Sequence, residues 1–156
     1  MGKFVQSRRM TEYFDRLNLN STTGKIDHRM EQWWLCAQIG LIANEKGDPP
    51  GQGSSDMVDY FIGSLKNGQG RIRGILLMRH FNNVDAGGMS KTVLEAEMNR
   101  MLSGGDSKLS DAGTSMLDRY ATGGFQIILD EIRQQTELYT FMRKYHTLIQ
   151  TLSQSA

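Results

Sequence analysis

Hydrophobic residues in the N-terminal part of the chain recur at helical spacing. Within residues 3–17, the stripe at i, i+3, i+4 and i+7 consists of Met10, Tyr13, Phe14 and Leu17. This pattern predicts an amphipathic helix, and residues 1–20 are also suited to a docking arm. Asp27, after a polar loop, is placed to cap the next helix, because its carboxylate accepts hydrogen bonds from the free N–H groups of a first turn.

Residues 29–44 are apolar on nearly every side after the first turn, which is typical of a buried helix. Cys36 lies inside this segment with no His or acidic residue beside it, so we interpret it as a small core residue rather than a nucleophile. Residues 47–55 are rich in Gly, Pro and Ser and are predicted to form a loop. It is not a phosphate-binding loop, since the lysine and the Ser or Thr of that motif are missing.

Three shorter helices are predicted in the middle of the chain. The first is capped by a residue among positions 54–56, and its apolar face consists of Met57, Val58, Phe61, Ile62 and Leu65. The second covers the run 71–81, which also fits a strand, although we favour a helix. Its inward-facing residues are expected to be Ile72, Ile75, Leu76 and Met78. Ser90 is expected to cap the third. The apolar residues of that helix are Val93, Leu94, Met98, Met101 and Leu102.

Two longer helices are predicted in the last third of the chain. Gly123 and Gly124 lie inside the first, over residues 110–134, where each glycine costs about 1 kcal/mol relative to alanine. A sequence that accepts this cost usually needs a close helix-to-helix approach, inside the fold or against a partner. In the last helix, Phe141 and Tyr145 belong to an a/d-like seam that either closes the core or docks a partner.

The composition favours an all-α fold. Only two of the 156 residues are prolines, and they are adjacent, so nearly the whole chain is free of helix breakers. The ten methionines fit a helical core padded with flexible side chains, although Met also recurs on adaptable binding surfaces. We therefore predict a compact single-domain helical bundle of about six to seven helices over residues 1–156.

Charge and cysteine content exclude several classes of protein. The formal net charge is +1, so no global field draws the chain to nucleic acid or to a membrane. A single cysteine excludes an internal disulfide. No apolar run reaches the roughly 18 residues of a membrane span, and no signal peptide follows the first residues. We expect a soluble, cytoplasmic protein without a membrane partner.

The sequence shows no convergent catalytic or metal-binding pattern. The histidines His28, His80 and His146 are scattered, and none lies at i, i+4 from another, the spacing that would place two ligands on one helix face. A Gly-x-Ser-x-Gly motif is also missing. We therefore expect no catalytic residue, no metal site and no cofactor, and we expect that the chain is not an enzyme.

One stretch of the chain carries positive charge that no neighbouring acid opposes. No acidic residue occurs between Asp59 and Asp85. The basic residues of this interval are Lys66, Arg71, Arg73, Arg79 and His80. Guanidinium groups form paired hydrogen bonds with phosphate oxygens, so we predict contact with a DNA or RNA backbone without base readout. Alternatively, the arginines pair with acids from other helices. Weaker basic additions are Lys3, Arg8, Arg9, Arg143 and Lys144.

Two stretches of the chain resemble the small accessory proteins of bacterial DNA-phosphorothioation (dnd-type) defence loci. They are RYATGGFQIILDEI at residues 119–132 and MEQWWLCAQIGLIANEKGDPP at residues 30–50. The matching features are a helix that ends in a Lys/Gly/Pro loop, at 39–50, and a Tyr-Ala-x-Gly-Gly-apolar stretch, at 120–125. Neither is a catalytic motif, and residues 47–55 and the last helix depart from the family pattern.

The resemblance implies a non-catalytic accessory subunit of a bacterial antiphage DNA-defence complex, bound to a larger ATPase or nuclease subunit. The small middle components of three-gene ATPase-based defence systems are a similar class. The main alternative is a helical small subunit of a ribonucleoprotein effector that lines a nucleic-acid channel. A nucleotide-sensing or small-molecule-sensing module, and an enzyme whose site only the fold assembles, are two further alternatives.

Overall fold

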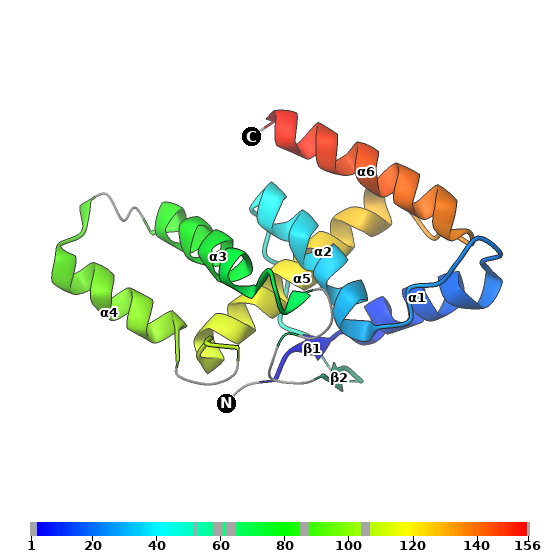
Figure 1. Cartoon of the computed structure of the whole chain (residues 1–156). Helices are drawn as coiled ribbons and strands as arrows, with labels where there is room; N and C mark the ends of the chain where they lie inside the picture. The colour runs from blue at the N-terminus through cyan, green and yellow to red at the C-terminus, as the bar shows by residue number, and fades with distance from the viewer. Residues whose placement is uncertain are drawn as a thin grey trace. The chain divides into compact units, whose positions relative to one another are not determined.

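The computed structural model describes residues 3–51, 53–57, 61, 65–84, 88–103 and 107–155. These residues form six α-helices and a two-stranded sheet, which confirms the predicted helical fold class (Figure 1). The elements are β1 (Val5–Gln6), α1 (Arg8–Asn20), α2 (Arg29–Ala43), β2 (Ser55–Asp56), α3 (Gln69–Asn83), α4 (Lys91–Met101), α5 (Asp111–Glu131) and α6 (Leu138–Ser155).

Contacts between Cα atoms divide the chain into two compact units. Unit 1 comprises Met1–Phe4 and Val58–Leu117, and unit 2 comprises Val5–Met57 and Asp118–Ala156. The boundary on the C-terminal side falls inside α5, between Leu117 and Asp118. The helix predicted between Met57 and Leu65 lies mostly outside the described residues.

The first helix of unit 2 buries the predicted stripe but begins later than expected. Met10, Tyr13, Phe14 and Leu17 are all buried, so α1 belongs to the core of this unit. The prediction of a helix from residue 3 was wrong, because Val5 and Gln6 pair antiparallel with Asp56 and Ser55. Ser7 then caps α1 by accepting a 3.2 Å hydrogen bond from the Met10 amide.

The central helix of unit 2 is α2, as its apolar sequence predicts. Trp33, Cys36 and Ile39 are fully buried, which confirms Cys36 as a core residue. The helix ends where Asn44 adopts a left-handed conformation with φ of 55°. The prediction that Asp27 caps α2 was wrong: the residue at the cap position is His28, one place along, and its side chain makes no capping hydrogen bond.

Glycines let α2 and α5 cross at backbone contact. A Cβ atom placed on Gly124 would collide with the carbonyl oxygen of Cys36, and one placed on Gly40 would collide with that of Tyr120. Gly123 similarly faces the carbonyl oxygen of Glu45, just beyond the end of α2. Both helices therefore need glycine at the crossing, since any side chain would push the two backbones apart.

The last helix, α6, closes unit 2 by packing on α2 (Figure 1). Phe141, Tyr145 and Leu148 are buried along its inner side. The Tyr145 hydroxyl donates a 2.7 Å hydrogen bond to the Leu35 carbonyl, which fixes α6 against the middle of α2. Burial raises the pKa of Tyr145 far above its ordinary value, so this hydroxyl keeps its proton.

The loop after α1 and the start of α6 are joined by reciprocal hydrogen bonds. Ser21 Oγ accepts a hydrogen bond from the Leu138 amide, and Thr23 Oγ1 accepts one from the Tyr139 amide, at 3.0 and 3.1 Å. In return, the Glu137 carboxylate accepts from the amides and hydroxyls of Thr22 and Thr23. These hydrogen bonds, led by that from the Thr22 amide, lower the pKa of Glu137 below its ordinary value.

We expect Glu137→Gln to lower the Tm by roughly a few degrees at pH 7, because an amide replaces the charged acceptor. A carboxyl whose folded pKa is lowered stabilises the protein above its unfolded pKa, and loses that contribution as the pH falls through the folded pKa. The difference from wild type should therefore disappear in acid. Thermal unfolding followed by circular dichroism, at pH 7 and in acid, measures the difference in Tm between the variant and the wild type. Asp15→Asn, on the exposed side of α1, is the matched control.

Candidate interaction surfaces

The apolar run at 71–81 forms a helix, α3, rather than a strand, as favoured from the sequence. Ile72 and Leu76 are buried in unit 1, as predicted. The prediction that Met78 faces inward was wrong, because its side chain is 52% exposed. Positions 76 and 78 are separated by about 200° around a helix, so they cannot share one buried face.

The basic residues predicted to bind a nucleic-acid backbone do not all share one exposed face. Lys66 and Arg71 are exposed, whereas Arg73 Nη1 donates hydrogen bonds to the Ser107 carbonyl at 3.1 Å and to Gln69 Oε1 at 3.3 Å. Arg71 and Arg73 lie about half a turn apart on α3, so the structure does not bring them to one face. Arg79 is half-buried on the same helix.

His80, the last residue of the predicted cluster, is buried and forms a hydrogen bond with an acidic side chain. Its Nε2 lies 2.7 Å from Glu97 Oε2 on α4, and Arg100 contacts the same oxygen at 3.3 Å. The hydrogen bond from His80, followed by that from Arg100, lowers the pKa of Glu97. Sequence spacing did not reveal this contact, because the two residues are 17 positions apart and on different helices.

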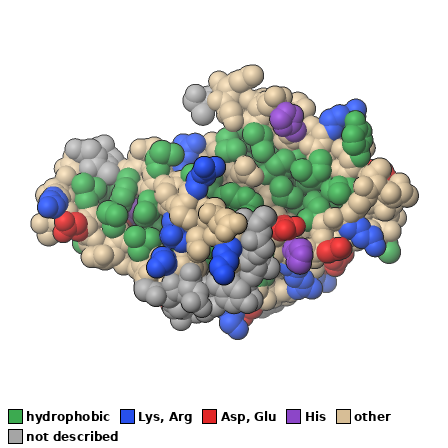
Figure 2. Space-filling view, in the orientation of Figure 1, with side chains coloured by type: hydrophobic (Ala, Val, Ile, Leu, Met, Phe, Trp, Pro, Cys, Tyr) green, Lys and Arg blue, Asp and Glu red, His purple; other side chains and the backbone are tan. Residues whose placement is uncertain are grey.

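The helix α4 is capped as predicted, but few of its side chains are buried. Ser90 Oγ accepts a 3.3 Å hydrogen bond from the Val93 amide. Of the eleven residues of α4, only Met101 is buried, while Val93 and Met98 are 47% and 39% exposed. Val93 and Met98 lie on the two sides of the row formed by half-buried Leu94 and buried Met101, and we call Val93, Leu94 and Met98 the α4 face. Figure 2 shows hydrophobic side chains on the surface over α4, at the left of the view.

All four residues predicted to serve helix packing or a partner are buried inside unit 2: Gly123, Gly124, Phe141 and Tyr145. The Phe141 ring lies 5.8 Å from that of Phe14 and 5.9 Å from that of Tyr145, measured between centroids. These residues therefore hold α1, α2, α5 and α6 together, and their side chains are not exposed to an external partner.

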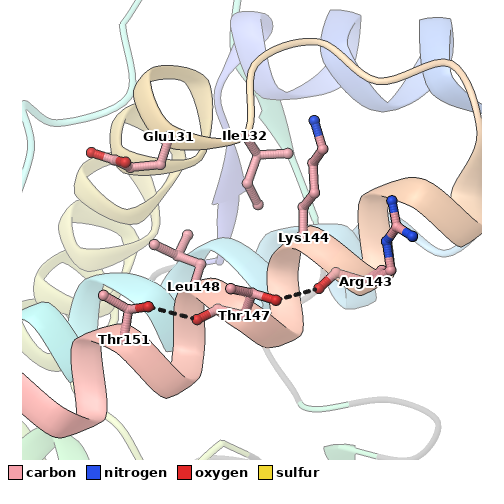
Figure 3. Close-up of a pocket in the computed structure, with 7 residues that line it drawn as sticks. All are labelled: Glu131, Ile132, Arg143, Lys144, Thr147, Leu148 and Thr151. Atoms are coloured by element: carbon pink, nitrogen blue, oxygen red, sulfur yellow. Dashed lines mark hydrogen bonds between the residues drawn. The ribbon is translucent and has the colours of Figure 1, made fainter.

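A groove in unit 2 lies between the end of α5 and the side of α6 that faces it. Its volume is about 390 Å³, and its lining residues are Glu131, Ile132, Arg143, Lys144, Thr147, Leu148 and Thr151 (Figure 3). Sequence reasoning counted Arg143 and Lys144 only as weak additions to the basic cluster. The groove had no sequence signal, since it arises where two helices with separate periodic patterns meet.

Within the part of the chain that the structure describes, no group of three or more His, Cys, Asp or Glu residues could hold a metal ion. Burial raises the pKa of the Cys36 thiol well above its ordinary value, which favours its protonated form.

None of the described helices is both long enough and apolar enough to cross a membrane. Comparison of the chain with protein-family models, with curated proteins and with solved structures finds no match.

Proposed function

We propose that this protein is a non-catalytic subunit that binds a larger partner protein through the α4 face. The observation that supports this most directly is an eleven-residue helix with one buried side chain. Helices of this length gain most of their stability from packing of an apolar face rather than from intrinsic propensity. A partner that covers Val93, Leu94 and Met98 would supply the missing packing.

The setting we propose is a bacterial antiphage DNA-defence complex in the cytoplasm, with an ATPase or nuclease as the larger subunit. The support for this setting is the resemblance of residues 30–50 and 119–132 to accessory proteins of such systems. Contact with a nucleic-acid backbone is part of the proposal, through the exposed side chains of Lys66 and Arg71. It would be non-specific, since phosphate contacts carry no sequence information.

We expect the double substitution Val93→Glu and Met98→Glu to reduce recovery of the partner at least tenfold. Two carboxylates on the α4 face would be desolvated by a covering partner without any opposing charge. The measurement is affinity purification of the tagged chain from its native host, with quantification of a co-purifying ATPase or nuclease by mass spectrometry.

The matched control is Thr92→Glu with Asn99→Glu, which adds the same charge to the opposite, exposed side of α4. Circular dichroism checks that both variants fold. Equal recovery of the partner with both double variants would contradict the role of the α4 face. Recovery of the wild-type chain alone, as a folded monomer, would contradict the accessory-subunit function itself.

A further inference from the structure

The groove between α5 and α6 has an apolar middle and a charged residue or pair at each end. Ile132 and Leu148, which are 3% and 9% exposed, point toward each other and form the floor of its middle part (Figure 3). Arg143 and Lys144 lie at one end, and Glu131 and Thr151 lie at the other. Along α6, positions 143 and 151 are separated by about 12 Å, which is the length of about two helical turns.

The charged groups at the two ends form no ion pair with any residue that the structure describes. None of the ion pairs among the described residues involves Arg143, Lys144 or Glu131. The Arg143 guanidinium instead lies over the Tyr139 ring, 5.9 Å from its centroid. The groove is therefore complementary to a ligand that carries an acid, an apolar group and a base in that order.

The hydrogen-bonding groups in the wall of the groove favour a helical ligand over an extended one. Thr147 Oγ1 donates to the Arg143 carbonyl at 3.2 Å, and Thr151 Oγ1 donates to the Thr147 carbonyl at 3.0 Å. These walls are helices whose amides are used within the helix, so they offer no strand edge for an extended peptide. A helix satisfies its own backbone and binds through side chains alone.

We propose that this groove binds an amphipathic helix of a partner protein. The partner helix presents an acidic residue to Arg143 and Lys144, an apolar residue to Ile132 and Leu148, and a basic residue to Glu131. At helical spacing these three residues lie near i, i+4 and i+8. The groove belongs to unit 2 and does not involve the α4 face, so this proposal stands or fails separately from the proposed function.

The test uses a fluorescein-labelled helical peptide of roughly 18 residues with Glu, Leu and Lys at i, i+4 and i+8, in an otherwise Ala- and Gln-rich sequence. Its anisotropy is measured as the full-length protein is added. We expect saturable binding that weakens as salt is raised. The double substitution Arg143→Glu and Lys144→Glu should weaken binding of this peptide at least tenfold. The doubly substituted protein should instead bind more tightly to a second peptide, which has Lys, Leu and Lys at the same three positions.

The matched control is Lys25→Glu with Arg29→Glu, which makes the same charge change at exposed positions of unit 2 outside the groove. This control should bind the first peptide as wild type does. Equal affinity of the two double variants for that peptide would overturn the proposal. So would the absence of saturable binding to the wild-type protein up to about millimolar concentration, the weakest affinity that a specific interaction of this kind would have.

Discussion

Gly124→Ala should lower the free energy of unfolding by at least about 3 kcal/mol, at the upper end of the cost of overpacking a core. The added Cβ would collide with the Cys36 carbonyl oxygen, and it would also approach the Gly40 amide nitrogen at 2.6 Å. Both are backbone atoms of α2, so no side chain can rotate away, and the two helices must separate. Urea unfolding monitored by circular dichroism at 222 nm measures the loss.

Two other glycines serve as matched controls, because a Cβ on either would meet no atom within 4 Å. Gly51→Ala, in a loop of unit 2, should leave stability nearly unchanged. Gly74→Ala, inside α3, should raise stability by about 1 kcal/mol through helix propensity. If Gly124→Ala unfolds at the same urea concentration as Gly51→Ala, the close crossing of α2 and α5 does not exist in solution.

The sequence predicted those elements whose stability depends on one local pattern. The stripe on α1 was correct residue by residue, because i, i+3, i+4 spacing reports directly on one helix face. The glycine pair at 123 and 124 correctly indicated a close approach, since the cost of glycine in a helix has to be offset by packing. What the pair could not reveal is its partner, because Gly40 and Cys36 lie more than 80 positions away.

Features that depend on two distant segments were missed. A two-residue strand such as Val5–Gln6 has no periodicity of its own, and only its pairing with Ser55–Asp56 defines it. His80 was grouped with basic neighbours in the sequence, although the fold pairs it with Glu97. A charge run along a chain therefore says little about a binding surface until the helix phase and the neighbouring helices are known.

A second large effect concerns Asp118, an acidic residue that is 4% exposed in unit 2. Its Oδ1 accepts hydrogen bonds from the Val5 amide at 3.1 Å and from Trp33 Nε1 at 3.0 Å. Burial nevertheless raises the pKa of Asp118 to about 7, and the negative charge of Asp56 adds to the effect. The carboxyl is thus held in a site that favours its neutral form.

The raised pKa makes stability fall as pH rises. In the unfolded chain Asp118 loses its proton near its ordinary pKa of about 3.9, whereas the folded protein keeps it until about pH 7. Between these values the native state binds more protons, so the stabilisation present below about pH 4 is lost as the pH approaches 7. The full difference corresponds to about 4 kcal/mol.

Asp118→Asn should remove this dependence, because the amide keeps the Oδ1 acceptor for Val5 and Trp33 but cannot ionise. We expect the variant and the wild type to be equally stable near pH 4, and the variant to be more stable by up to about 4 kcal/mol at pH 8. Urea unfolding across this range measures the difference, in which the contributions of titrating groups that do not interact with Asp118 cancel between the two proteins. Asp118→Ala should be less stable than Asp118→Asn at every pH, because it leaves the Trp33 and Val5 donors buried and unsatisfied. Parallel pH profiles for wild type and Asp118→Asn would show that Asp118 ionises in the folded protein as it does in the unfolded chain, and that its site does not favour the neutral acid.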